Sequence, residues 1–175
     1  MADSVVYDQI PVVRAIGRGA TSLAAFHDAL VTMECGFYNL VRLSSVIPPG
    51  TAVDPSGKAP VPVGAWGDKL YCVYAEQHAS LPGEEAWAGI GWVQRRDGRG
   101  GLFVEHEGTS EAYVRQAIKA SLRDLVKGHE DEFDGPDYVV HGVVCDGEPV
   151  CALVLAPYET APWRGVAASQ PPAIN

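Results

Sequence analysis

The chain has 175 residues, of which 47% are hydrophobic and 20% are charged, which is typical of one folded domain and excludes a disordered chain. It carries 22 acidic and 13 basic residues, giving a formal net charge of −9. A field of that sign repels phosphate groups, so we expect neither nucleic acid nor a membrane surface as a partner. No stretch reaches the roughly 18–20 consecutive apolar residues that a membrane-spanning helix needs.

The spacing of cysteine and histidine gives no sign of a metal site. The four cysteines form no Cys-x-x-Cys pair, and the five histidines form no His-x-His or His-x-x-x-His pair. We therefore expect no metal. The N-terminal residues lack the basic and apolar segments of a signal peptide, so we expect a cytoplasmic protein with reduced thiols at Cys35, Cys72, Cys145 and Cys151.

The N-terminal part of the chain predicts a strand, a helix and a second strand. The apolar stretch 10–16 predicts the first strand, and Thr21 can cap a helix that ends at Gly36. Residues 37–45 are rich in aromatic and branched side chains and predict the second strand, followed by a loop over 50–64. Helical spacing marks the face expected to be buried: Leu23, Phe26, Leu30 and Met33.

The remaining strands are predicted by short apolar runs between turn signals. A charged turn over 95–101 joins two of them, and residues 128–136 are expected to form an acidic loop. Asp146-Gly147 is a strong hairpin signal between the last two strands. The tail 157–175 contains prolines and little periodicity. Strands are expected at 70–76, 86–93, 102–106, 138–145 and 150–156.

A second helix is predicted between two of these strands. Thr109 or Ser110 can cap it, and it is expected to run to about Lys127. Its predicted buried face consists of Val114, Ile118, Leu122 and Leu125. Because strands outnumber helices and mostly follow one another directly, the fold class is α+β, a single domain with largely antiparallel sheet and helices packed outside.

A serine pair stands out at the end of the second predicted strand. The segment 39–50 reads NLVRLSSVIPPG, in which Ser44 and Ser45 are soon followed by a Pro-Pro-Gly turn. By itself such a pair indicates only two hydroxyls that satisfy backbone groups at a strand end. The surrounding residues therefore decide whether these serines have a chemical role.

The wider segment 25–50, AFHDALVTMECGFYNLVRLSSVIPPG, resembles the pyruvoyl-dependent arginine decarboxylase family. In that family a similar helix, an Asn-Leu-Ile/Val-Arg strand, a Ser-Ser pair and a Pro-Pro turn follow in this order. Residues 101–108, GLFVEHEG, resemble the family's strand with its catalytic glutamate. The resemblance extends over roughly residues 10–156 and implies an αββα sandwich that assembles as a homotrimer or a higher oligomer of trimers, with active sites between subunits.

The resemblance implies that the chain cleaves itself between Ser44 and Ser45. The Ser45 hydroxyl would attack the carbonyl of Ser44, and β-elimination followed by hydrolysis would leave a pyruvoyl group derived from Ser45. The shift needs oxyanion stabilisation, which an amide donor can supply, and the family's pattern gives a processing role to Asn39. Read without the resemblance, Asn39 is an ordinary polar residue on a strand.

The resemblance also implies decarboxylation of an amino acid through a Schiff base with the pyruvoyl group, with no metal. A general acid must then protonate the α-carbon, and Glu105 occupies the family's position for it. Burial beside apolar neighbours can raise the pKa of a glutamate to suit that task. Glu107 shares the face of the strand, and the choice of Glu105 rests on the resemblance.

The substrate side of the predicted site departs from the family. Arginine-decarboxylating members have an Asp after the Phe of the helix, whereas Phe26 is followed here by His27 and then Asp28. Histidine does not offer the two oxygens that a guanidinium prefers, and a one-residue offset turns a helical side chain by about 100°. The substrate is thus arginine or a different amino acid, with His27 and Asp28 as candidate substrate-binding residues.

Two other functions compete with this hypothesis. The chain is alternatively an uncleaved, non-catalytic relative that acts as a binding or partner subunit. It is also compatible with a pyruvoyl enzyme that performs other imine chemistry in a biosynthetic pathway. The joint presence of Asn39, Ser44, Ser45 and Glu105 favours the decarboxylase.

Overall fold

The computed structural model describes residues 9–164. Most of the strands form two stacked sheets, and two helices pack against them. No helix in this part of the chain is long and apolar enough to cross a membrane. The elements are β1 (Gln9–Pro11), β2 (Val13–Arg18), α1 (Ser22–Thr32), β3 (Asn39–Arg42), β4 (Val46–Ile47), β5 (Ala52–Asp54), β6 (Lys69–Ala79), β7 (Glu85–Arg95), β8 (Gly101–Gly108), α2 (Glu111–Leu125), the short 3-10 helix η1 (Glu130–Glu132), β9 (Phe133–Val144) and β10 (Val150–Ala161).

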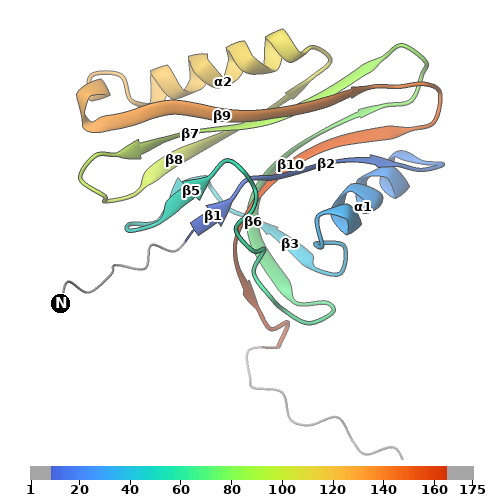
Figure 1. Ribbon diagram of the computed structural model, residues 1–175, viewed down its shortest axis with the longest axis horizontal. Helices are drawn as coiled ribbons and strands as arrows, with labels where there is room; N and C mark the ends of the chain where they lie inside the picture. The colour runs from blue at the N-terminus through green and yellow to red at the C-terminus, as the bar shows by residue number, and fades with distance from the viewer. Residues whose placement is uncertain (1–8, 165–175) are drawn as a thin grey trace, which may run out of the picture.

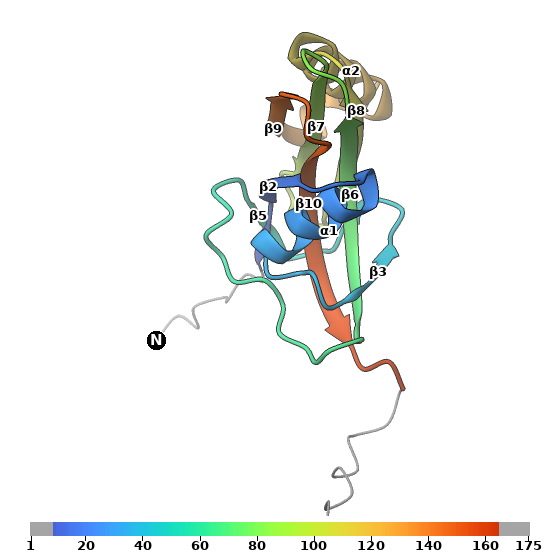
Figure 2. The same ribbon diagram turned by 90° about the vertical axis from the view of Figure 1, so that its right-hand side faces the viewer.

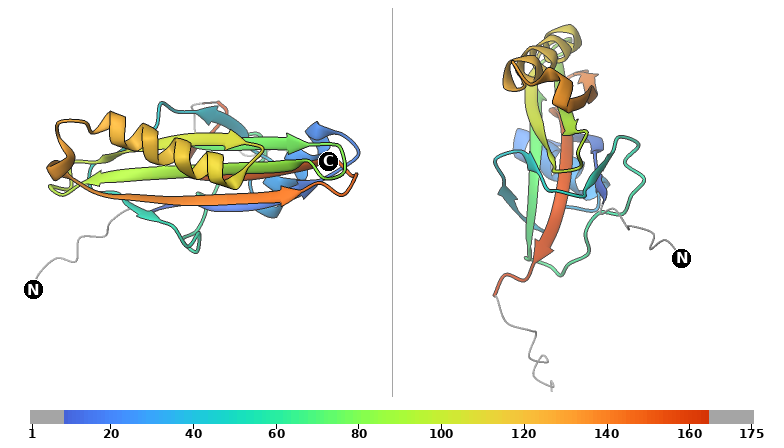
Figure 3. Two further views of the ribbon diagram at one scale, coloured as in Figure 1. Left: turned by 90° about the horizontal axis from the view of Figure 1, so that it is seen from above. Right: turned by 90° about the vertical axis from the view of Figure 1, so that its left-hand side faces the viewer.

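The architecture is an αββα sandwich, which confirms the predicted fold class (Figure 1). One four-stranded sheet has the order β2-β10-β6-β3 and the other the order β4-β8-β7-β9. All neighbours within these two sheets are antiparallel except β3 and β6, and β1 and β5 form a separate parallel pair. Figure 2 shows α2 and α1 on opposite sides of the stacked sheets, and Figure 3 shows α2 lying along β7, β8 and β9.

Three layers of buried apolar side chains hold the sandwich together. The central layer lies between the two sheets and contains small residues beside larger ones such as Ile90, Trp92 and Phe103. A second layer packs α1 on one sheet, and a third packs α2 on the other. Alternate side chains of a strand point to opposite faces of its sheet. Both faces of the central strands β6, β7 and β10 are covered, so these strands carry buried apolar side chains on both faces.

Helix α1 packs on its sheet through small residues. Thr21 caps it as predicted, with its hydroxyl accepting from the backbone N–H of Ala24 at 3.1 Å. Ala25 and Ala29 are fully buried, and a Cβ added at Gly17 would collide with the backbone of both. Leu23 is 77% exposed, so its predicted burial is wrong. The close approach of Gly17 to the helix turns Ala25 and Ala29 toward the sheet, which leaves Leu23 facing solvent.

Helix α2 follows the sequence pattern more closely. The side chain of Ser110, not that of Thr109, caps it by accepting from the N–H of Tyr113. The predicted residues Val114, Ile118 and Leu122 are buried. Leu125 is 55% exposed and Val126 is buried instead, because the helix ends at Leu125 and the chain then turns.

The strand predictions fail mainly where the chain changes sheet. The stretch 10–16 is divided between β1 and β2, which belong to different sheets. Strands β9 and β10 are not hairpin partners, since β9 pairs with β7 while β10 pairs with β2 and β6, so residues 145–149 cross between the sheets. The predicted acidic loop 128–136 instead contains η1 and the start of β9. The predicted tail begins too early, because β10 continues to Ala161; residues 165–175 lie outside the described part.

Candidate active site

The serine pair lies where the chain passes from one sheet to the other. The N–H of Leu43 donates to the carbonyl of Cys72 at 2.9 Å, which extends the pairing of β3 with β6. Two residues later, the carbonyl of Ser45 accepts from the N–H of Phe103 on β8 at 2.8 Å. Ser44 is exposed between these two anchors. The Ser44–Ser45 peptide bond therefore lies in the short segment that spans the gap between the sheets.

Ser45 adopts a backbone conformation that is unfavourable for a residue with a side chain. Its φ angle is 69°, in the left-handed region that favours glycine, and only one other non-glycine residue in the described chain, Glu34, shares this feature. Left-handed backbone in a non-glycine residue costs of order 1–3 kcal/mol and persists only where its surroundings hold it. Here the bonds to β8 on one side and to β6 on the other provide that restraint.

The hydroxyl of Ser45 meets the carboxylate of Glu105. Ser45 Oγ donates to this carboxylate, lying 2.8 and 2.9 Å from its two oxygens. Glu105 follows Phe103 on the face of β8 that points to the opposite sheet, whereas Val104 packs against α2. The structure therefore brings together two of the predicted site residues that lie 60 positions apart in sequence.

Burial is the main influence on the pKa of Glu105. It raises the pKa of this carboxyl above its ordinary value, while the hydrogen bond from Ser45 and the charge of Arg42 oppose the rise and the charge of Glu107 adds to it. Glu107 itself is exposed. Of the two carboxylates on this face of β8, Glu105 is thus the one in contact with the serine.

Arg42 and Tyr158 complete the surroundings of the pair. The guanidinium of Arg42 donates to the carbonyl of Tyr74 at 2.7 Å and lies 4.7 Å from the centre of the Tyr74 ring. The hydroxyl of Tyr158 donates to the carbonyl of Val46 at 3.1 Å, next to Ser45. Burial and the charge of Glu105 raise the pKa of Tyr158, so it stays a neutral phenol.

A cavity of about 730 Å³ opens beside this arrangement. Leu43 and Val46, which flank the serine pair, line it together with Tyr71, Tyr158 and Glu159. The sequence analysis missed Tyr158 and Glu159, because it assigned residues 157–175 to a tail. A strand pattern continued through 157–161 would have placed Tyr158 on β10 beside the predicted site.

The other predicted site residues lie elsewhere in the chain. The side-chain amide of Asn39, at the start of β3, donates to the carbonyl of Gly67 at 2.7 Å. A carboxylate oxygen of Asp28 accepts from the N–H of Arg18 at 2.9 Å. His27 lines a different cavity of about 540 Å³, beside Phe37, Tyr38 and Trp66. Within one chain, the structure therefore pairs Ser45 with Glu105 but does not bring Asn39, His27 or Asp28 to them.

Comparisons with known proteins assign the chain to a family. The family described as pyruvoyl-dependent arginine decarboxylase matches residues 9–161. A protein of that name from Halobacterium salinarum (strain ATCC 29341 / DSM 671 / R1) is 34% identical over 146 residues, which cover 81% of this chain and 88% of the relative. Another of that name, from Thermococcus sibiricus, is 36% identical over 153 residues, covering 82% and 92% of the two chains.

Among solved structures, a pyruvoyl-dependent histidine decarboxylase at pH 8 overlaps 59% of this chain and 54% of its own, with a TM-score of 0.44 and 19% identity. The sequence comparisons decide the family, since the match spans nearly all described residues and both relatives exceed 30% identity over most of their length. The chain belongs to the pyruvoyl-dependent arginine decarboxylase family, a family of carboxy-lyases.

Proposed function

We propose that the chain is a self-processing pyruvoyl-dependent decarboxylase of an amino acid. The observation that carries this proposal is the Ser45 hydroxyl, which sits on strained left-handed backbone and is hydrogen-bonded to the half-buried carboxyl of Glu105. Family membership supplies the reaction class. The proposal is further supported by the geometry, in which the Ser45 hydroxyl contacts the Glu105 carboxyl next to the constrained Ser44–Ser45 peptide bond.

Self-processing begins with attack of Ser45 Oγ on the carbonyl carbon of Ser44. The Ser44–Ser45 amide becomes an ester, and the hydroxyl proton passes to the released amine of Ser45. Loss of the α-proton of Ser45 then expels the Ser44 carboxylate by β-elimination and leaves a dehydroalanine. Water hydrolyses its tautomer to a pyruvoyl group and ammonia. The anchors on both sides of Ser44 favour the first step, because they hold the reacting groups in one strained arrangement.

The residues around Ser45 fit a pyruvoyl group at this position. Such a group supplies a carbonyl that condenses with the substrate's amino group and takes up electrons as carbon dioxide leaves. Glu105 lies within hydrogen-bond distance of the Ser45 side chain, and its raised pKa suits a carboxyl that holds a proton and delivers it to the α-carbon of the substrate. The cavity lined by Tyr71, Tyr158 and Glu159 offers space for the substrate.

The substrate is an amino acid, arginine or another. The named relatives are arginine decarboxylases, but His27 stands where the resemblance predicts the guanidinium-binding Asp. Asp28 already caps the N–H of Arg18, which leaves it less free to bind a guanidinium. The cavity beside His27 is lined by aromatic and aliphatic side chains and by Glu34. In an active site shared between subunits, as proposed below, this lining would meet the substrate's side chain and suits one with an apolar stem and a polar or charged end.

A screen of the standard amino acids tests the proposed function. The purified protein is incubated with each amino acid, and release of carbon dioxide and formation of the matching amine are both measured. We expect turnover of one amino acid, or of a small group with similar side chains. A fully cleaved chain that forms no amine from any of them would contradict decarboxylation. A chain that stays intact would favour the non-catalytic binding subunit.

We also propose that the active site is completed by a second copy in a homotrimer. This rests on the separation of the site residues, since Asn39 contacts Gly67 and His27 lines another cavity, while Ser45 contacts Glu105. Large apolar side chains near His27 also face solvent in the single chain, with Val63 90% and Trp66 86% exposed. Such a patch is typical of a protein–protein interface.

A complementation experiment tests the role of Asn39 across subunits. We expect Asn39→Ala alone to slow cleavage about 10²–10³-fold, as the loss of one oxyanion donor does in other sites. Coexpression with a Ser45→Ala chain, which cannot be cut but retains Asn39, is expected to restore cleavage of the Asn39→Ala chain in mixed oligomers. Mass spectrometry distinguishes the two chains. Fast cleavage of Asn39→Ala alone would contradict the processing role, and failure of rescue would contradict action across subunits.

We place the enzyme in the cytoplasm. This proposal is supported by its four free thiols, all of which are buried. Persistent thiols are typical of a reducing compartment.

A further inference from the structure

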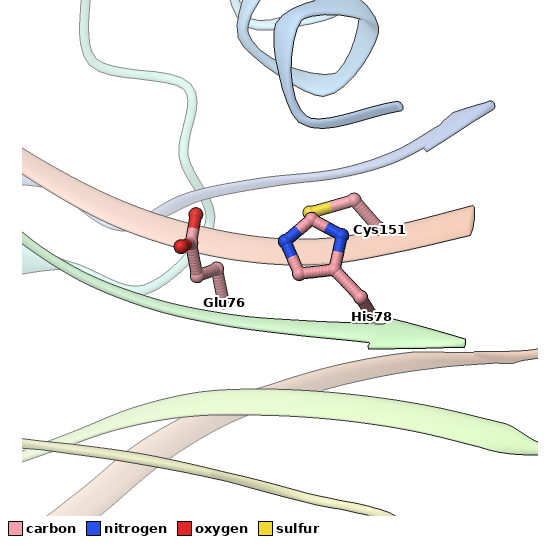
Figure 4. Close-up of side chains that lie close together, drawn as sticks. All are labelled: Glu76, His78 and Cys151. Atoms are coloured by element: carbon pink, nitrogen blue, oxygen red, sulfur yellow. The ribbon is translucent and has the colours of Figure 1, made fainter. Parts of the chain in front are cut away.

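Three metal-binding side chains from two neighbouring strands lie close together, away from the candidate active site. Glu76 and His78 come from β6, and Cys151 comes from β10 (Figure 4). Cys151 pairs directly with His78 across the sheet, and Glu76 follows on the same face two residues away. One ligand atom from each residue lies within 4.8 Å of the others.

Two polar atoms of this cluster lack any partner. Oε2 of Glu76 and Nδ1 of His78 are shielded from solvent, and neither forms a hydrogen bond within the part of the chain that the structure describes. Within residues 9–164, they are the two buried side-chain nitrogen or oxygen atoms that lack a hydrogen-bond partner. Because buried polar atoms are almost always paired, two orphaned polar atoms beside one thiol indicate a missing ligand.

The environment of Cys151 argues against a catalytic role for the thiol. Its side chain is fully buried. A nucleophilic cysteine needs an accessible thiol instead. A bound cation would pair with the buried sulfur and satisfy both orphaned polar atoms at once.

We propose that Glu76, His78 and Cys151 bind one Zn²⁺ ion through a carboxylate oxygen, an imidazole nitrogen and Sγ. A set of one sulfur, one nitrogen and one oxygen suits Zn²⁺, whereas Mg²⁺ and Ca²⁺ prefer oxygen ligands alone. β6 pairs with β3 only through Lys69–Cys72, and Glu76 and His78 lie on the part of β6 beyond that pairing. Both side chains are half-buried, so water can supply the fourth ligand from this side.

The role of this ion is structural. Cys151 and Tyr158 are seven positions apart along β10, which corresponds to about 23 Å. Because Tyr158 contacts Val46, the neighbour of Ser45, the proposed zinc site and Ser45 lie toward opposite ends of β10. β6 and β10 are the two central strands of their sheet. An ion that bridges β6 and β10 would join the two strands with which β3 and β2 pair and on which α1 packs.

Cobalt binding tests the proposal without reference to activity. The full-length protein is stripped of metal with a chelator and titrated with Co²⁺, an optical substitute for Zn²⁺. We expect about one equivalent to bind, with a thiolate-to-cobalt charge-transfer band in the near ultraviolet and visible bands typical of four-coordinate cobalt. Zn²⁺ should displace the cobalt. Zn²⁺ at a hundredfold excess over its dissociation constant is also expected to raise the melting temperature by about 5–10 °C.

Matched cysteine variants assign the ligand. Cys151→Ala is expected to abolish the charge-transfer band, whereas Cys35→Ala, which removes another buried thiol on the α1 side of the sheet, should retain it. Wild-type protein without the band, or a Cys151→Ala chain that keeps it, would overturn the proposal.

Variants of the other two ligands guard against a Cys151→Ala chain that fails to fold. Glu76→Gln and His78→Gln leave every thiol in place, and each is expected to weaken Co²⁺ binding at least tenfold. Circular dichroism confirms that each variant is folded. Unchanged affinity in both folded variants would equally contradict the site, and would leave a bound water as the partner of the orphaned atoms.

Discussion

Ser45→Ala is expected to leave the chain intact and to abolish decarboxylation completely. The wild-type protein should separate on denaturing electrophoresis into fragments 1–44 and 45–175, the second blocked at its N-terminus by the pyruvoyl group. Alanine removes both the attacking oxygen and the group expelled in β-elimination, so no slower route through the same steps remains. Intact mass and amine formation measure the two losses separately.

The neighbouring serine offers a matched control for this result. Ser44 contributes its carbonyl to the proposed reaction, and its side chain is exposed. We therefore expect Ser44→Ala to be cleaved and to decarboxylate within a few-fold of wild type. A Ser45→Ala chain that still splits at this bond would show that cleavage has another origin. A wild-type chain that keeps a free Ser45 after long incubation would remove the basis of the whole mechanism.

Glu105→Gln is expected to be cleaved normally but to lose turnover by about 10²–10⁴-fold, the usual contribution of a positioned general acid. Glutamine retains an oxygen that can accept from Ser45 Oγ, so the precursor geometry is preserved. It has no carboxylic proton to deliver to the α-carbon. The measurements are the extent of cleavage by mass and kcat for amine formation, with Glu107→Gln on the same face of β8 as the control.

The pH dependence of kcat provides a second readout of Glu105. Burial raises its pKa, and the form that donates a proton is the neutral acid. Turnover should therefore be constant at low pH and fall tenfold per pH unit above that raised pKa. Glu105→Gln should lack this decline, whereas Glu107→Gln should retain it. A wild-type decline at the ordinary pKa of an exposed glutamate would contradict a buried general acid.

The fold class and the family were predictable because they depend on features that the chain carries locally. Strand and helix patterns and capping residues lie within short stretches, as do the two motifs that carry the resemblance, 39–50 and 101–108. The αββα sandwich and the family are confirmed by the structure and by the comparisons. The roles of Ser45, Glu105 and Asn39 stay predictions, although the contact between Ser45 and Glu105 agrees with two of them.

Features that depend on the choice of sheet were not predictable in the same way. Asp146-Gly147 has the composition of a hairpin turn, yet the strands on either side join different sheets. The hydrophobic spacing on α1 selected Leu23, whereas close packing at Gly17 favours the alanines. The cluster of Glu76, His78 and Cys151 forms only through the register of β6 with β10, so the spacing of cysteine and histidine along the chain could not reveal it.

The position of Ser44 between the two sheets has a consequence for folding after the proposed cleavage. The helices and strands described before the proposed cut are β1, β2, α1 and β3, and they pair with or pack on strands that lie after it. The proposed cleavage would thus turn one chain into two whose mutual contacts are core contacts, with the new ends anchored to opposite sheets. The two fragments would lose the high effective concentration that a covalent link provides. We therefore expect the uncut precursor to refold from a denatured state more efficiently than the separated fragments.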